Sequence, residues 1–147
     1  MTTLRLATPH DIPCLIDIES SVSGTKVFSP MLTEEEWLRE MGKSTVYIIE
    51  KNSEVMGNVS FEKKEDGQVY FSGLVIYPKF QGRGIGRQVM NKLFEQLKDI
   101  KIFSLVTHLD NIAALKLYQS LGFVVKERVE NYFGDGEPRL KLEYERK

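Results

Sequence analysis

Three glycines stand at alternate positions, Gly82, Gly84 and Gly86, between an apolar run halted by Pro78 and a helical apolar spacing that starts at Ile85. The N-terminus of a helix has backbone N–H groups without intrahelical partners and the positive end of the helix dipole, so it binds anions. Glycines there permit positive φ and let phosphate oxygens approach the backbone. The segment predicts a pyrophosphate site, and a glycine-rich turn without a ligand is the open alternative.

Two common nucleotide motifs do not fit this segment. No Lys-Ser or Lys-Thr pair follows the last glycine, as a P-loop would require. A dinucleotide fingerprint would place the third glycine one residue later and would follow a parallel βαβ start, whereas antiparallel strands are expected before this unit. The pattern therefore does not favour ATP or NAD as the ligand.

Composition narrows the class of protein. The 147 residues are enough for one domain, 1–147, and a hydrophobic fraction of 41% with 28% charged residues is ordinary for a soluble globular chain. No apolar run approaches the ~20 residues of a membrane helix. The net charge of −1 comes from interspersed acids and bases, so no basic stripe for nucleic acid is present. The first residues do not resemble a signal peptide and Cys14 is the only cysteine, which predicts a cytoplasmic protein.

The elements that must position the glycine segment follow from apolar periodicity. The pattern predicts a βααβββαβαββ order and hence an α/β domain with a mixed sheet. Thr33 should cap the second helix and Gly42 should end it, and the last two strands should form a hairpin around Asp135-Gly136. Strands are expected at 4–7, 45–50, 54–64, 67–78, 101–109 and twice within 123–145, and helices near 12–18, at 33–42, from 85 and at 111–121.

Two motifs carry a family resemblance. "QGRGIG", Gln81 to Gly86, resembles the Q/R-x-x-G-x-G/A signature of the GNAT superfamily of N-acetyltransferases, and "NIAALKLYQSLGF", Asn111 to Phe123, resembles its second motif. The resemblance covers nearly the whole chain and is strongest to the ribosomal-protein alanine and protein N-terminal acetyltransferases. It implies a GNAT-type mixed central sheet with helices on both faces.

The resemblance implies acetyl-CoA as the acetyl donor and no metal. The glycine loop and helix start would hold the coenzyme pyrophosphate, and the strand before the loop would splay from its parallel neighbour and pair with the pantetheine amides. Asn111 would bind the coenzyme arm, a role compatible with capping its helix. The residues implied are Leu74, Val75, Ile76, Gly82, Arg83, Gly84, Ile85, Gly86, Arg87 and Asn111.

Two residues are candidates for proton transfer. Tyr118 matches the tyrosine that protonates the departing thiolate in the family, although a core aromatic at helical spacing would look the same. The position of the family's glutamate or histidine base is Val106 here. His108 lies two residues later on the same side of the strand, which makes it the nearest substitute, and the alternative is a packed, hydrogen-bonded histidine.

The acceptor is expected to be a primary amine. Glu19 resembles a glutamate that shapes the acceptor pocket, and Tyr132 resembles a tyrosine laid over the incoming amine, with Phe133 in place of a commoner second tyrosine. An α-amine needs less help from a base than lysine does, so a peptide or protein N-terminus is favoured. The alternatives are a small amine, such as an amino acid, polyamine or drug, and a non-catalytic coenzyme A-binding module. Cys14 is expected in the core, direct attack is expected, and the protein could be a monomer or a homodimer.

Overall fold

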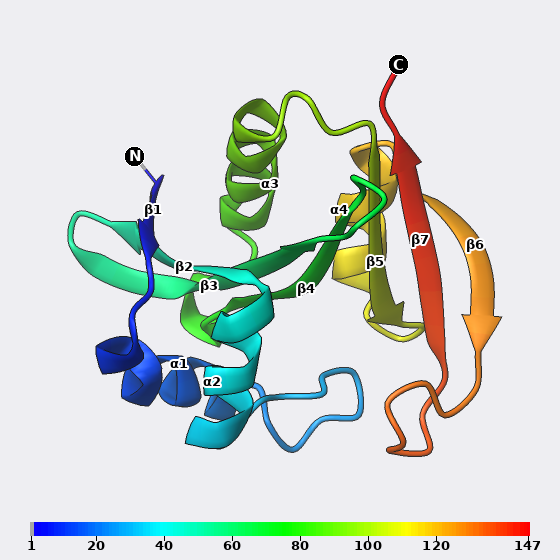
Figure 1. The fold of residues 1–147 in the computed structure, drawn as a ribbon. Helices are drawn as coiled ribbons and strands as arrows, with labels where there is room; N and C mark the ends of the chain where they lie inside the picture. The colour runs from blue at the N-terminus through cyan, green and yellow to red at the C-terminus, as the bar shows by residue number, and fades with distance from the viewer. Residues whose placement is uncertain (1) are drawn as a thin grey trace.

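The computed structural model describes residues 2–147, in which the strands form one mixed sheet in the order β1-β2-β3-β4-β5-β7-β6 (Figure 1). The strands are β1 (Thr2–Leu6), β2 (Thr45–Lys51), β3 (Glu54–Lys63), β4 (Val69–Ile76), β5 (Ile102–His108), β6 (Val124–Val129) and β7 (Arg139–Glu145). The helices are α1 (Ile12–Ser20), α2 (Glu34–Lys43), α3 (Ile85–Gln96) and α4 (Ile112–Ser120), with 3-10 turns η1 (Pro9–Asp11) and η2 (Pro78–Phe80). The expected order of elements is confirmed. None of the helices in this part of the chain is long and apolar enough to cross a bilayer.

Helices cover both faces of the sheet. On β2, Ile48 belongs to a core with Leu15 of α1 and Trp37 of α2, whereas Ile49 belongs to a core with Val89 of α3. Neighbouring residues of a strand point to opposite faces. The pair α1 and α2 therefore covers one face, and α3, joined by residues of α4, covers the other.

Local capping signals explain where several helices begin. The Thr33 hydroxyl accepts a hydrogen bond from the Glu36 N–H at 3.2 Å, and the Asn111 side chain accepts one from the Ala114 N–H at 3.3 Å. Both caps satisfy an N–H group of the first helical turn. The expected end of α2 at Gly42 is wrong, because the helix continues through Gly42 to its last residue, Lys43.

The sheet opens between β4 and β5. These parallel strands pair over three residue pairs, the last of which is Phe71 with Leu105. On the other side of β4, the register with β3 shifts at the same place and leaves Ser72 as a bulge. A bulge bends its strand and increases the local twist. Beyond Phe71, β4 therefore turns away from β5, as the resemblance implied.

The connection between β6 and β7 differs from the expected tight hairpin. β6 ends at Val129 and β7 begins at Arg139, so Asp135-Gly136 lies in a longer loop. Asn131, at a φ of 51°, accepts a hydrogen bond from the Gly136 N–H at 2.6 Å. The loop is thus folded on its own polar groups, and its composition alone resembled a two-residue turn.

Arg146 holds the far end of α3. Its guanidinium donates to the Phe94 carbonyl at 2.9 Å and to the Ile100 carbonyl at 2.8 Å, and also to the Leu97 carbonyl. Carbonyls at a helix C-terminus lack intrahelical donors and lie at the negative end of the dipole. Arg146 therefore fixes the helix whose other end carries the glycine loop.

Candidate functional site

The N-terminus of α3 presents free backbone N–H groups beside open space. Gly82 and Gly84 have φ values of 78° and 79°, and a Cβ on either would meet no atom within 4 Å. The first bond of the helix runs from the Gln88 N–H to the Gly84 carbonyl at 3.1 Å. The N–H groups of residues 85–87 therefore have no partner within the helix. Together with the open space over the two glycines they form an anion cradle.

Gly86 differs from the other two glycines. It lies in the first turn of α3 and is not among the residues with positive φ. A Cβ there would lie 3.2 Å from Leu117 Cδ2 on α4. Its missing side chain thus allows α3 and α4 to pack closely, while its N–H still points into the cradle turn.

A groove extends from the cradle between the end of β4 and the start of α4. Leu74 and Ile76 line it from β4, and Asn111, Ala113, Ala114, Leu117 and Tyr118 line it from the α4 region. The two arginines expected beside the coenzyme differ in their positions. Arg87 lines the groove and donates to the Ser120 hydroxyl at 2.7 Å, whereas the Arg83 guanidinium lies over the Phe80 ring at 5.5 Å.

A second pocket, the inner pocket, occupies the gap between β4 and β5. Its walls come from residues 71–75 of β4, 105–107 of β5 and 27–31 of the α1–α2 connection. The residues that line both the groove and this pocket are Phe28, Leu74, Asn111, Ala114 and Tyr118. The two hollows therefore meet beside Tyr118. An extended ligand anchored at the α3 N-terminus would reach the gap, where backbone groups of β4 are free of β5.

Tyr118 presents a hydroxyl at this junction. Its ring packs edge-on against Phe123, with centroids 5.7 Å apart. Burial alone, without a hydrogen bond, raises the pKa of Tyr118 to about 12, so the hydroxyl is protonated across the neutral range. The ring therefore packs in the core, while the residue also lines both hollows.

Glu19 is a buried carboxylate in the floor of the inner pocket. It is 5% exposed, accepts a hydrogen bond from the Met31 N–H at 3.0 Å and another from Asn58 Nδ2 at 3.2 Å. Burial raises the pKa of Glu19, an effect that the two hydrogen bonds oppose. Because Met31 belongs to the α1–α2 connection, Glu19 also holds that connection against β3. Asn58 lines the pocket too and had no local sequence signal.

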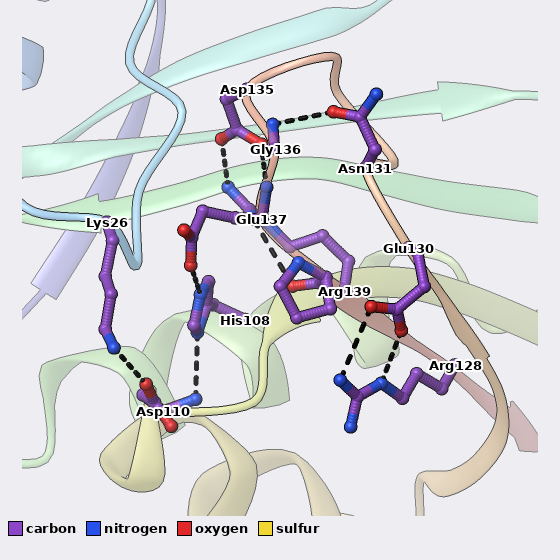
Figure 2. A network of polar contacts seen from close by, with 11 residues as sticks. Lys26, His108, Asp110, Arg128, Glu130, Asn131, Asp135, Gly136, Glu137 and Arg139 are labelled. Atoms are coloured by element: carbon purple, nitrogen blue, oxygen red, sulfur yellow. Dashed lines mark hydrogen bonds and ion pairs between the residues drawn. The ribbon is translucent and has the colours of Figure 1, made fainter.

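His108 does not line either hollow. It is 2% exposed, its Nε2 lies 2.7 Å from Glu137 Oε1, and its Nδ1 accepts a hydrogen bond from the Asp110 N–H at 2.9 Å (Figure 2). Both ring nitrogens are therefore engaged with the protein. Asp110 in turn pairs with Lys26 at 2.7 Å. His108 thus joins the end of β5 to the β6–β7 loop, and the structure does not bring it to Tyr118.

The β6–β7 loop brings Phe133 rather than Tyr132 to the pocket. Phe133 lines the inner pocket, and the Tyr132 ring packs against it at 4.8 Å without lining the pocket itself. Tyr132 instead lies near Tyr70, whose pKa is raised by burial and by the neighbouring Tyr132 hydroxyl. The loop therefore places Phe133 at the pocket, and Tyr132 lies behind it.

Arg139 was not predicted from the sequence. It is 1% exposed and lines the inner pocket, and its guanidinium lies 5.1 Å from the Phe133 ring centre. Arginine is seldom fully buried, and this one stands in the alternating run of β7. No local pattern distinguishes it from a solvent-facing residue of an edge strand.

Cys14 lies away from both hollows. It packs against the two cores under α1, and burial raises the pKa of its thiol. A buried neutral thiol is a weak nucleophile. In the part of the chain that the structure describes, His, Cys, Asp and Glu side chains do not gather in a group of three or more that could hold a metal ion.

Comparisons with known proteins agree with this geometry. The family described as "Acetyltransferase (GNAT) family" matches residues 15–123. The L-amino acid N-acyltransferase MnaT of Escherichia coli is 32% identical over 93 residues, which cover 59% of this chain and 54% of that relative. The chain spans about half the length of the curated relatives it matches.

Solved structures share the fold at lower identity. The ribosomal-protein-S18-alanine N-acetyltransferase of Escherichia coli has a TM-score of 0.84 at 20% identity, covering 99% of this chain and 94% of that one. A GNAT family acetyltransferase from Elizabethkingia anophelis, solved with acetyl-CoA bound, has a TM-score of 0.78 at 20% identity, covering 98% and 97%. The whole described fold thus has counterparts in solved acetyltransferases.

Proposed function

Because the chain belongs to the GNAT family of acetyltransferases, we propose that it transfers an acetyl group from acetyl-CoA to a primary amine by direct attack. The observation that carries the proposal is the continuity of the two hollows, which share Tyr118. One end of this path, at the α3 N-terminus, suits an anion. The other end is the pocket that lies between β4 and β5. Two substrates would therefore meet beside a protonated hydroxyl.

The residues along the groove fit coenzyme A. The free N–H groups of residues 85–87 suit a pyrophosphate, and the open space over Gly82 and Gly84 leaves room for its oxygens. The unpaired edge of β4 at residues 74–76 suits the amides of the pantetheine arm, which need donors and acceptors in an extended register. Asn111 keeps its amide nitrogen for the same arm while its oxygen caps α4. When bound there, acetyl-CoA would supply the reactive thioester.

Tyr118 is the proposed general acid. As the amine nitrogen forms its bond to the acetyl carbon, the Tyr118 hydroxyl would pass its proton to the departing thiolate and regain one from the nitrogen. The neutral amine carries the proton that is lost, so the products are the amide and the free thiol. Cys14 is partly buried and lies outside both hollows, which supports transfer without a covalent enzyme intermediate.

The acceptor is proposed to be an α-amine. At pH ~7.4 about a fifth of an α-amine is neutral, against about a thousandth of a lysine side chain, a difference of roughly 3 kcal/mol. His108 has both ring nitrogens bonded to the protein outside the pocket, and Glu19 is the one carboxylate that lines it. A pocket with so little base nearby suits an amine that loses its proton easily.

Two kinds of α-amine remain candidates. A peptide or protein N-terminus is supported by the fold shared with the S18-alanine acetyltransferase and by the aromatic pair of the β6–β7 loop. A free amino acid is supported by the relative named as an L-amino acid acyltransferase and by the small inner pocket, which residues 27–31 line on one side.

Release of free thiol from acetyl-CoA tests the proposal. We would compare peptides with different N-termini, the same peptides with blocked N-termini and one lysine, polyamines and free amino acids. Thiol release that requires a free α-amine is expected. If acetyl-CoA raises the melting temperature but no amine releases thiol, a non-catalytic coenzyme A-binding module replaces the enzyme; if acetyl-CoA leaves it unchanged, the cofactor assignment fails.

A further inference from the structure

Arg139 is a cation sealed in the wall of the inner pocket. It begins β7 opposite His108 of β5, and only 1% of its surface is exposed. The Phe133 ring covers the guanidinium on the side of the loop. Burying a charge is costly unless several polar partners replace its water. The hydrogen-bond partners of Arg139 therefore indicate whether it has a purely structural role or also binds a ligand.

The protein uses only part of the hydrogen-bonding capacity of this guanidinium. Arginine has five N–H donors. Nη1 donates to the Pro138 carbonyl at 3.3 Å, and Nη2 donates to Asp135 Oδ2 at 2.9 Å (Figure 2). These two bonds use two of the five donors. Because Arg139 lines the pocket, the other donors are the ones that a ligand in the pocket would engage.

The charge of the pocket lining points the same way. Glu19 and Arg139 are its ionisable carboxylate and guanidinium, and Glu19 already accepts two hydrogen bonds from the protein. Asp135, the ion-pair partner of Arg139, has 36% of its side chain exposed and lies outside the lining. Arg139 thus keeps donors beyond its ion pair with Asp135, whereas Glu19 already accepts two hydrogen bonds, which favours an anionic ligand group beside Arg139.

We propose that Arg139 binds a carboxylate of the acceptor, so that the enzyme takes an α-amine carried on an anionic molecule. The carboxylate is either the α-carboxylate of a free amino acid or an acidic side chain near a peptide N-terminus. Arginine and carboxylate match as a planar fork, which orients as well as attracts. This inference rests on the proposed acetyl transfer and names the acceptor class of the same pocket.

Matched acceptor pairs test the inference. Thiol release is measured with leucine against leucinamide, with each kcat/KM calculated for the neutral amine because the carboxylate of leucine raises the pKa of the amine beside it. Peptides carrying Asp or Glu at the second position are compared in the same way with peptides carrying Asn or Gln. We expect kcat/KM to favour the acid of one pair by about 10- to 100-fold, the effect of a hydrogen bond to a charged group. The free amino acid pair and the peptide pair distinguish the two sources of the carboxylate.

Three variants separate recognition from loop anchoring. In Arg139→Gln the acid-to-amide ratio should fall toward one, and Arg139→Lys should retain part of the preference because it keeps charge without the fork. Asp135→Asn removes the competing carboxylate from an exposed site and should raise the ratio. If Arg139→Gln does not fold, Arg139→Lys and Asp135→Asn decide the outcome.

Other results would overturn the inference. Equal losses with acids and amides in the Arg139 variants would mean that the residue only anchors the β6–β7 loop. A wild-type preference for amides in kcat/KM calculated for the neutral amine would exclude a carboxylate subsite. Absence of thiol release with every acceptor would instead refute the proposed enzyme. The subsite would then be judged by the melting-temperature shift that leucine and leucinamide cause in the wild type and in Arg139→Gln, and equal shifts would refute it.

Discussion

Tyr118→Phe removes one hydroxyl from the junction of the two hollows and keeps the ring. The edge-on packing against Phe123 is retained, and desolvation rather than a hydrogen bond is what shifts the pKa of the hydroxyl. Stability and affinity for acetyl-CoA should therefore stay near wild-type values. Acetyl transfer should slow, because the departing thiolate would lose its proton donor.

The pKa of Tyr118, about 12, sets the size of the effect. A thiol has a pKa near 8.5, so giving the proton to a fully formed thiolate would be unfavourable by about 3.5 pKa units, or about 5 kcal/mol. The Tyr118 proton must then move to sulfur while the carbon–sulfur bond breaks and while the amine nitrogen gives its proton to the Tyr118 oxygen. General acids contribute about 10²- to 10⁴-fold. For so weak an acid we expect a loss near the lower end, about 100-fold in kcat.

Stopped-assay thiol release with one saturating α-amine acceptor, between pH 7 and pH 10, measures this loss. Tyr144→Phe is the matched control, since Tyr144 packs among Phe94, Phe103 and Phe123 outside both hollows. With the pKa of Tyr118 at about 12, about 1% of it is ionised at pH 10, so wild-type kcat should not fall on the alkaline side. A kcat for Tyr118→Phe equal to that of Tyr144→Phe would refute its role as the acid. If wild-type kcat falls near pH 10, and only Tyr118→Phe abolishes that fall, then burial does not raise the pKa of Tyr118 to about 12.

Three further substitutions probe the scaffold. A Cβ in Gly57→Ala would lie 2.0 Å from the Val75 carbonyl oxygen, so we expect a loss of more than about 2 kcal/mol in urea unfolding. Gly73→Ala, whose Cβ meets only a side-chain oxygen at 3.4 Å, is its control, and equal losses would contradict the steric cause. Arg146→Ala should cost about 2 kcal/mol, or about 4–8 °C in Tm by calorimetry, and Arg146→Lys less; an unchanged Tm would show that the α3 clamp contributes nothing. Burial raises the pKa of Glu19, so the stability that Glu19 contributes is fully present below its unfolded pKa and is lost as pH rises through its folded pKa. Over that pH window the stability of Glu19→Gln should therefore increase relative to wild type. A difference in stability that does not change with pH would contradict this expectation.

The geometry of the glycine loop and of the groove beside it was largely predictable because it is local in sequence. The glycine loop and the start of α3 are consecutive residues, and the second motif places Asn111 and Tyr118 on one helix. Capping residues such as Thr33 also act within one turn. Gly86 shows the limit of such reading, since a glycine needed for positive φ and one needed for close helix packing look the same in a sequence.

The acceptor side could not be predicted because it is assembled from distant segments. The pairing of His108 with Glu137 and the burial of Arg139 depend on where the β6–β7 loop folds. A histidine near a strand end and an arginine in an alternating strand carry no signal of these partners. The loop itself is longer than the expected hairpin, and Phe133 rather than Tyr132 lines the pocket.

The short contact between β4 and β5 has a consequence for the dynamics of the free protein. Only three residue pairs join the β1–β4 half of the sheet to the β5–β7 half within the sheet itself. A ligand lying in the gap would complete hydrogen bonds that the polypeptide leaves unmade. It would therefore link the two halves of the sheet. Without ligand, the amides at the splayed end of β4 should exchange with solvent by local opening, and coenzyme should slow them more than those of β2 or β3. The same gap that admits the substrates thus makes the rigidity of the whole sheet depend on occupancy.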